Sequence, residues 1–213
     1  MTTEIEQDVW GLTAAGEAIV RYRMRNACGA EVELTNLGAA VTAVRVPDRE
    51  GRIADVAIGY ADAADYLRDP ANAGKTIGRF ANRIAGGLMT LDGEEYRLEN
   101  NCGRNHLHGG SDGFARRIWE SRVETNRVVM TLLSPDGDQG YPGELEAEAV
   151  FDFDDDNSLE ITYRAATDRT TVVNLTNHLY VNLDGEQAGS VLDHELQLHA
   201  SRVLEVDERQ LPT

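Results

Sequence analysis

Polar side chains fill alternate positions of one short segment of the sequence, residues 173–183. They are Asn174, Thr176, His178, Tyr180 and Asn182. An extended chain sends alternate side chains to opposite faces of a strand, so these side chains would share one face. Amides, a hydroxyl, an imidazole and a phenol form hydrogen bonds without a fixed opposing charge, which suits a ligand with many hydroxyl groups. The pattern predicts a strand that binds a sugar.

The positions between them carry apolar side chains, which suits burial in a core. They are Val173, Leu175, Leu179, Val181 and Leu183, with Asn177 as the polar exception. Antiparallel sheets often have one face in water, so a strand of this composition could also be an ordinary solvated one. The segment alone leaves both interpretations open.

The elements that position such a strand are predicted by alternation elsewhere in the sequence. Apolar residues alternate with polar ones around residues 20–24, 32–34, 56–60 and 145–153, which predicts half-buried strands. Asp92-Gly93 and the run at 154–157 lie between such stretches and are typical of hairpin turns. Helical periodicity is confined to a short piece around Ala61 to Leu67. We expect an all-β fold, a β-sandwich or a related architecture, in a single domain spanning residues 1–213.

Composition limits the class of partner. The 213 residues include 41% hydrophobic and 27% charged residues, and the formal net charge is -17 with a pI near 4.6. A nucleic acid or an anionic membrane would require a concentrated positive surface, so neither is expected as a partner. The acidic residues are spread along strands and turns, and we interpret them as a solvated surface.

Location and redox state follow from what the sequence lacks. The first residues carry neither the basic start nor the apolar core of a secretory signal, and no run approaches the roughly 18 apolar residues of a membrane span. A cytoplasmic protein is expected. Cys28 and Cys102 are too few and too far apart for a disulfide scaffold or a cysteine-rich metal site, so we predict reduced thiols without a functional role.

Loops rich in glycine and polar residues are predicted at 74–87 and 100–114. The first offers Arg79, Asn82 and Arg83, and the second offers His106 and His108 beside glycines that let the backbone approach a ligand closely. The arginines could also be structural ion-pair partners in so acidic a chain. A zinc site at His-x-His is disfavoured, because no second histidine or cysteine motif supports it.

Short motifs together carry a resemblance to a known family. In order and spacing the sequence resembles the galactose mutarotase, or aldose 1-epimerase, family, from about Leu34 onward. The motifs are Gly-Arg-Phe-Ala-Asn-Arg-Ile at 78–84, Asn-His-Leu-His-Gly-Gly at 105–110, Gly-Tyr-Pro-Gly at 140–143 and Asn-Leu-Thr-Asn-His-Leu-Tyr-Val-Asn-Leu at 174–183. The resemblance implies a large twisted antiparallel β-sandwich, the galactose mutarotase-like supersandwich, with an open sugar cleft and neither cofactor nor metal.

The resemblance also implies roles for individual residues. His178 matches the family's general acid, and His108 matches a second catalytic imidazole near the ring oxygen of the sugar. Asn82, Arg83 and Tyr180 match positions that contact the sugar. The expected reaction interconverts the α and β anomers of free aldohexoses such as glucose or galactose. One group removes the proton of the anomeric hydroxyl while another protonates the ring oxygen, and imidazole suits such transfers near neutral pH.

One departure from the family pattern affects this expectation. The family's general base is a glutamate in a C-terminal segment, and this sequence stops at Leu211-Pro212-Thr213 before that segment begins. The resemblance therefore implies a chain without its base and a sandwich that is incomplete at the C-terminus. Unpaired sheet edges would then favour self-association.

Other functions stay open on the sequence. A hexose-6-phosphate epimerase would need a basic pocket for phosphate, which the acidity of the chain disfavours. A sugar-binding or regulatory protein would keep the cleft without the base. An inactive fragment would neither bind an aldose nor interconvert its anomers. Sugar binding without anomer exchange would distinguish the binding protein from the enzyme.

Overall fold

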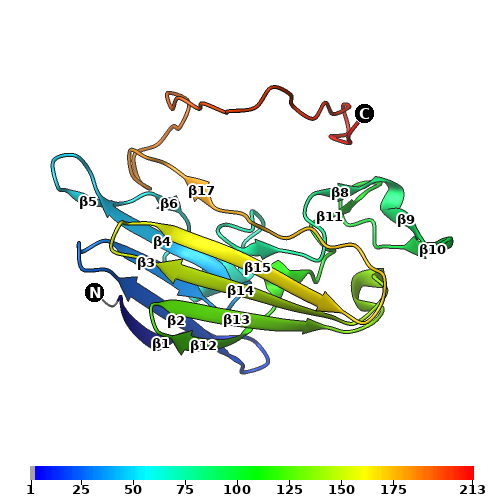
Figure 1. The fold of residues 1–213 in the computed structure, drawn as a ribbon, viewed down its shortest axis with the longest axis horizontal. Helices are drawn as coiled ribbons and strands as arrows, with labels where there is room; N and C mark the ends of the chain where they lie inside the picture. Colours follow the sequence, from blue (N-terminus) through cyan, green and yellow to red (C-terminus); the bar gives the residue numbers. More distant parts are fainter. Residues whose placement is uncertain (1–2) are drawn as a thin grey trace.

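Two antiparallel sheets packed face to face form the main body of the molecule (Figure 1). The computed structural model describes residues 3–213. The first sheet runs in chain order through β1 (Glu4–Leu12), β2 (Ala18–Arg25), β3 (Glu31–Thr35), β4 (Ala40–Pro47) and β5 (Ile53–Asp55). The second runs through β12 (Glu120–Glu124), β13 (Arg127–Ser134), β14 (Leu145–Phe153) and β15 (Leu159–Thr167). The all-β sandwich expected from the alternation is confirmed.

The core lies between the inner faces of these sheets. Tyr22 and Met24 of β2 point inward because they alternate with arginines, and they belong to the same buried cluster as Met130 of β13 and Phe151 of β14. The Tyr22 hydroxyl also lies 2.7 Å from the hydroxyl of Ser121 on β12, which satisfies its polar end at the sandwich interior. Period-two alternation therefore fixes which side chains of both sheets meet.

Both predicted hairpins are present. Asp92 and Gly93 join β9 (Leu88–Leu91) to β10 (Glu94–Arg97), and both residues have positive φ, as the tightest hairpin turns require. The 154–157 turn joins β14 to β15, where Asn157 has a φ of 61°. Asparagine tolerates this conformation better than most other residues with side chains.

The short helix expected around residues 61–67 is α1 (Ala63–Arg68). Asp62 caps it, because its carboxylate accepts the Asp65 N–H at 2.9 Å. Tyr66 on its buried face packs with Ile19 and Leu37 against the first sheet. Within residues 3–213 no helix has both the length and the apolar character needed to cross a bilayer.

The two glycine-rich loops lie together beyond one end of the sheets, as the β8 and β11 labels in Figure 1 show. They are joined where β8 (Arg83–Ile84) pairs with β11 (His106–Leu107). The connecting elements are β6 (Ala57–Ile58), β7 (Thr76–Ile77), η1 (Ala85–Gly87), η2 (Phe114–Arg116) and η3 (Asp138–Gly140). Both predicted loops are thus confirmed as largely irregular chain, tied together by a short two-stranded sheet.

The segment at 173–183 differs from the single strand that its alternation predicts. It forms β16 (Thr176–Asn177), which pairs with β7, and β17 (Tyr180–Val181), which pairs with β6. The segment thus pairs with two different short strands and does not form one continuous strand in one sheet. Side chains therefore do not alternate between two faces along its whole length. The exposed fraction is 70% for Leu183, whereas Asn182 is fully buried. The prediction of one apolar and one ligand-binding face was wrong at these positions.

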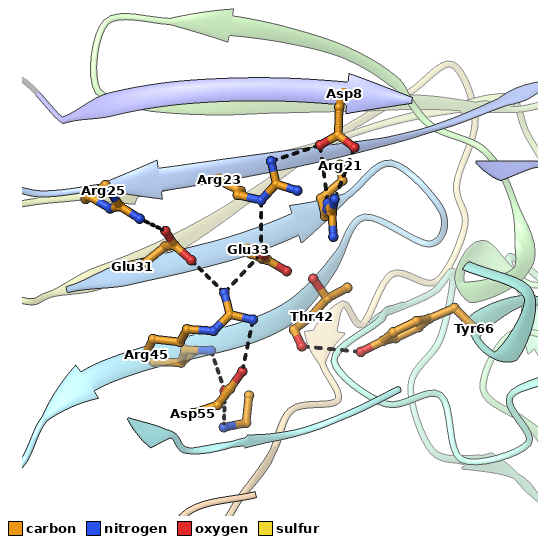
Figure 2. Close-up of polar contacts among 12 residues, drawn as sticks. Asp8, Arg21, Arg23, Arg25, Glu31, Glu33, Thr42, Arg45, Asp55 and Tyr66 are labelled. Atoms are coloured by element: carbon orange, nitrogen blue, oxygen red, sulfur yellow. Dashed lines mark hydrogen bonds and ion pairs between the residues drawn. The ribbon is translucent and has the colours of Figure 1, made fainter. Parts of the chain in front are cut away.

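Glutamates on β3 are a second difference. The sequence predicts a solvated face for Glu31 and Glu33, yet each is only 8% exposed. Figure 2 shows Arg45 lying between their carboxylates, with its Nη1 2.6 Å from Glu31 and 3.0 Å from Glu33. Cross-strand arginines on β2 complete the network, so the outer face of the first sheet is a ladder of ion pairs. Arginine stems cover the carboxylates that water would otherwise solvate.

Candidate active site

A cleft of about 540 Å³ opens where the two glycine-rich loops meet the 173–183 segment. Asn82, His108, His178 and Tyr180 line it, all of them predicted site residues. The remaining lining is Ala81, Asn174, Leu175, Thr176, Asn177 and Leu179. Residues from positions about a hundred apart in the sequence are therefore brought to one concave surface.

Two imidazole rings meet edge to face in this cleft. The ring centroids of His108 and His178 lie 5.4 Å apart, with the planes at 89° to each other. The phenol of Tyr180 also packs near His178, with its ring centroid 5.0 Å away. The arrangement places two groups capable of proton transfer and one aromatic surface beside the same space.

His108 is held by the loop that carries Asn82. The pairing of β8 with β11 brings these loops into register, and the Asn82 carbonyl then accepts the His108 N–H at 3.1 Å. In return, the Asn82 N–H donates to Nδ1 of the His108 ring at 3.0 Å. Because Nδ1 accepts this hydrogen bond, the neutral ring must carry its own proton on Nε2. His108 is thereby a hydrogen-bond donor through Nε2.

The charge state of His108 agrees with this geometry. Burial, together with the nearby charges of His178 and Arg83, lowers the pKa of His108 from 6.5 to about 4. The ring is therefore neutral at physiological pH. It can polarise an oxygen atom of a ligand by donating from Nε2, without carrying a charge.

His178 is fixed through its main chain. Its N–H donates to the Lys75 carbonyl at 2.8 Å, and its own carbonyl accepts the Gly74 N–H at 3.0 Å. The neighbouring pairing of β16 with β7 continues this contact through Thr176 and Asn177. The side chain of His178 is thus presented by a short antiparallel ladder, and the residue remains partly exposed at the cleft.

Tyr180 and Arg83 lie at the margins of the site. Tyr180 is 40% exposed, and its hydroxyl donates to the Ala71 carbonyl at 3.3 Å. Arg83 is absent from the cleft lining itself, but its guanidinium donates to the Asn82 side-chain oxygen at 3.1 Å. Among the ion pairs of residues 3–213 none includes Arg83, so its charge is available to a ligand.

Arg79, offered by the same motif, has a structural role instead. It is 1% exposed, and its guanidinium donates to the Ser134 hydroxyl and to the carbonyls of Ser134, Pro135 and Pro142 at 2.8–3.1 Å. These bonds tie the first glycine-rich loop to the end of β13. Arg79 therefore anchors the loop that carries Asn82 and cannot reach a ligand in the cleft.

His106 is also structural. It is fully buried, with Nδ1 2.7 Å from the Glu99 carbonyl and Nε2 2.7 Å from the Tyr141 hydroxyl. β11 ends at Leu107, and the left-handed φ of 55° at His108 turns the main chain there, so His106 is buried while His108 lines the cleft and the two imidazoles of His-x-His do not converge. Within the described part of the chain no group of three or more His, Cys, Asp or Glu residues could hold a metal ion.

Sequence reasoning missed some of what builds the cleft. Asn174 belongs to the polar ladder but is not among the predicted site residues, and its amide donates to the Ala81 carbonyl at 3.1 Å, which joins the first loop to the 173–183 segment. Asn182 is predicted on the ligand-binding face but is buried. Among residues 3–213, the cleft lining contains amides, imidazoles, a hydroxyl and a phenol, and no Asp or Glu.

Comparison with known proteins shows which family the sequence is similar to. A family profile described as aldose 1-epimerase matches residues 20–213, starting earlier than the Leu34 from which the motifs are recognisable. The galactose mutarotase of Sus scrofa is 41% identical over 209 residues, covering 98% of this chain and 61% of that protein. The aldose 1-epimerase of Escherichia coli is 43% identical over 202 residues, covering 94% and 58%.

Solved structures give the same result. An aldose epimerase homologue from C. elegans superimposes with a TM-score of 0.85 at 30% identity, covering 99% of this chain and 60% of that one. A galactose 1-epimerase from Lactobacillus acidophilus gives 0.76 at 28% identity, covering 85% and 54%. The chain spans about three fifths of the length of the relatives it matches over nearly its whole length. It has the galactose mutarotase-like fold and belongs to the aldose 1-epimerase family.

Proposed function

We propose that this chain binds free aldohexoses such as glucose or galactose in the cleft and acts on their anomeric centre as an aldose 1-epimerase. The observation that carries the proposal is the edge-to-face contact of the His108 and His178 rings beside the ring of Tyr180. Amide groups of Asn82 and Asn174 border the same cleft and can pair with sugar hydroxyls. Family membership supports the same chemistry.

The mechanism assigns different roles to the imidazoles. His178 in its protonated form gives a proton to the ring oxygen as the bond between that oxygen and C1 breaks. The anomeric hydroxyl loses its proton and becomes the aldehyde carbonyl. Rotation about the C1–C2 bond and closure in the reverse sense then yield the other anomer. His108 donates a hydrogen bond from Nε2 to the ring oxygen, and Arg83 and Asn82 hold hydroxyl groups.

The proton of the anomeric hydroxyl needs an acceptor. Since the lining within residues 3–213 contains no carboxylate, we propose that water or hydroxide takes this proton in this chain. One general base typically contributes about 10²–10⁴-fold, so the chain should be slower than an enzyme with a carboxylate base by about this factor. In this mechanism the chain itself supplies the general acid, His178.

The test is NMR exchange spectroscopy between the anomers of glucose and of galactose in the presence of the purified chain. Acceleration that His178→Ala abolishes would support the proposal. His194→Ala is the matched control, because His194 is a histidine outside the cleft lining. Acceleration that survives His178→Ala, or that disappears equally in the control, would contradict it.

The absence of a carboxylate from the described lining favours a second candidate, a sugar-binding protein without catalysis. It keeps the same residues in contact with the sugar. Saturation-transfer NMR would then report aldose binding that is weakened by His178→Ala and Tyr180→Ala, while the anomer exchange rate stays at its uncatalysed value. Binding together with acceleration would exclude this candidate.

We further propose that residues 1–213 act as one domain that self-associates. Apolar side chains on the extended segment after β17 support this, because exposed apolar surface favours association. The most exposed are Leu192 at 89%, Leu196 at 82%, Leu198 at 71% and Val203 at 92%. Light scattering coupled to size exclusion should report a species larger than 23.4 kDa that Leu196→Glu reduces in mass. A monodisperse monomer would contradict self-association.

We also propose a cytoplasmic location. Cys28 and Cys102 are free thiols, and Cys28 is exposed, which suits a reducing compartment. Fractionation of cells that produce the tagged chain would test the location, and recovery outside the cytoplasm would contradict it.

A further inference from the structure

A buried ion pair lies behind the cleft and has no part in the proposed reaction. Lys75 and Asp69 are each 1% exposed, and Nζ of Lys75 lies 3.4 Å from Oδ2 of Asp69. Burying two charges costs free energy unless each is paired and hydrogen-bonded. Both groups are placed in the turn at residues 69–75, immediately before β7. Their position therefore requires a structural or functional reason.

Asp69 is the centre of this turn. Its carboxylate accepts the N–H groups of Ala71 and Ala73, each at 2.7 Å, and the hydroxyl of Tyr60 at 3.0 Å. Burial opposes ionisation, but these hydrogen bonds and the charge of Lys75 hold the pKa of Asp69 below its ordinary value. The carboxylate is thus charged, and it fixes the main chain of the turn.

Lys75 closes the other end of the turn. Its ammonium donates to the Tyr66 carbonyl at 2.7 Å, at the C-terminal part of α1. Burial lowers the pKa of Lys75, and the charge of Asp69 opposes this change. One side chain therefore links α1, the turn and β7, and its ammonium has its partners within the protein.

The same turn forms hydrogen bonds with the 173–183 segment, which carries His178 and Tyr180. Lys75 and Gly74 form the reciprocal main-chain bonds to His178, and the Ala71 carbonyl accepts the hydroxyl of Tyr180. The Gly74 carbonyl also accepts the side-chain amide of Asn177 at 2.7 Å. The main-chain contacts that orient His178, and the hydroxyl contact of Tyr180, thus end on atoms of the turn that the ion pair fixes.

We propose that the Asp69–Lys75 ion pair is a positioning device that sets His178 and Tyr180 at the distance and angle the sugar requires. The inference rests on the proposed function of the cleft. Neither Asp69 nor Lys75 is among the residues that line the cleft, so in this proposal each acts through the main chain of the turn. Misplacing a catalytic group by about 1 Å typically costs about 10²-fold in rate, so a small shift of the turn is sufficient to matter.

The test begins with Lys75→Met, which keeps an unbranched apolar stem and removes the ammonium. We expect the anomer exchange acceleration to fall by about 10²-fold. The dissociation constant for glucose should rise as well. In ¹³C-histidine spectra the ring signals of His178 should shift, whereas those of the buried His106 should remain in place. Spectra recorded well below the melting temperature ensure that the folded state is observed.

Arg68→Met is the matched control. Arg68 lies on the last turn of α1 and pairs with Asp65 at 2.7 Å, but it is 72% exposed, so its loss should leave the sugar affinity and the His178 signals unchanged. Should Lys75→Met give a melting temperature, affinity and His178 signals like those of Arg68→Met, the positioning role is excluded.

A double variant covers the case in which Lys75→Met fails to fold. Asp69→Asn/Lys75→Met leaves no lone buried charge, and the introduced amide keeps one acceptor oxygen for the turn. We expect this variant to fold with shifted His178 signals and weakened sugar binding. Wild-type signals and affinity in it would show that the pair serves folding alone.

His178→Ala in the same assays separates the two proposals. Loss of sugar binding or exchange in His178→Ala, with no effect of either Lys75 variant, overturns the positioning role only. No effect of His178→Ala on binding or exchange overturns the proposed function itself. The histidine signals are read without sugar, so they report on positioning in either case.

Discussion

The Asn82 N–H donates to Nδ1 of His108 at 3.0 Å, and this single contact decides which ring nitrogen carries the proton. His108 has a φ of 55°, in the left-handed region, and that turn of the main chain lets its ring fold back onto the Asn82 loop. The Nε2–H group can then donate a hydrogen bond to a ligand while the ring stays neutral. Protonation of Nδ1 would place two donors against each other, so the contact and the neutral state support one another.

The pKa of His108 should be directly visible in its titration. ¹⁵N chemical shifts should show the Nε2–H tautomer at about pH 6.5 and protonation only near pH 4, because burial and the charges of His178 and Arg83 oppose the cation. A midpoint near 6.5 would show that the ring is solvated and that its contact with Asn82 is not maintained in solution.

The same shift makes folding stability depend on pH. The unfolded chain binds a proton at His108 below pH 6.5, whereas the folded chain binds it only below about 4. Between these values the unfolded state holds more protons, so stability at this site rises with pH and is lost as the pH falls from 6.5 to about 4. Urea unfolding at both pH values should show a larger loss for wild type than for His108→Gln. Equal losses would contradict the shift.

Substitution of Gly109 by Ala should destabilise the fold more than the same substitution of Gly103 in the same loop. A Cβ at Gly109, where φ is 83°, would collide with the Gly78 carbonyl oxygen, whereas at Gly103, where φ is 60°, it would meet nothing within 4 Å. Gly103→Ala should cost about 1–2 kcal/mol for the left-handed conformation. Gly109→Ala should cost roughly 1–3 kcal/mol more and shift the His108 ring signals. Chemical denaturation and NMR would measure both, and equal costs would contradict the close approach.

Replacing Arg79 or Arg83 of the same motif by Met should affect different properties, the folding stability for Arg79 and the sugar affinity for Arg83. Arg79→Met leaves a hydroxyl and three carbonyls without their donor in a buried site, which should lower the free energy of unfolding by about 3 kcal/mol or more. Arg83→Met should change stability by no more than about 0.5 kcal/mol but weaken sugar binding. Urea unfolding and a sugar titration test the pair, and reversed effects would refute these assignments.

The stability that the ion-pair ladder of the first sheet contributes should depend strongly on Arg45. Arg45→Met would leave the carboxylates of Glu31 and Glu33, side chains 10% and 11% exposed, without the guanidinium that lies between them. Removing one partner of a buried pair costs about 3–5 kcal/mol, and a smaller loss of about 2–3 kcal/mol is expected here because Arg45 is 36% exposed.

Arg52→Met is the control for this ladder. Its pair with Asp48 is 77% and 40% exposed, so its loss should cost at most about 1 kcal/mol. Urea unfolding of both variants compares a covered ion pair with a solvated one. The same cost in both would mean that the ladder contributes no more than an ordinary surface pair.

Much of the fold was predictable, because the local pattern and the tertiary structure agree there. Alternation in Leu145 to Phe153 predicts a strand with one buried face, and β14 has that face in the core. Asp92-Gly93 predicts a tight hairpin because both residues tolerate positive φ. In the site, His178 and Tyr180 follow from the polar pattern of residues 173–183, His108 and Asn82 follow from the family resemblance, and the structure brings all of them to one cleft.

Period-two patterns and short motifs are local properties of the chain, and they were sufficient to predict the sandwich, the hairpins and, by resemblance, the family and four side chains of the cleft lining. Three further features depend on contacts between segments that are distant in sequence. The 173–183 segment became two short strands because its pairing partners are β7 and β6. Glu31 and Glu33 were buried because arginines of neighbouring strands cover and neutralise them. Arg79 and His106 became anchors, whereas His108 lines the cleft and Arg83 lies at its margin, because the partners of Arg79 and His106 lie on strands and loops distant in sequence, and no local pattern specifies a distant partner.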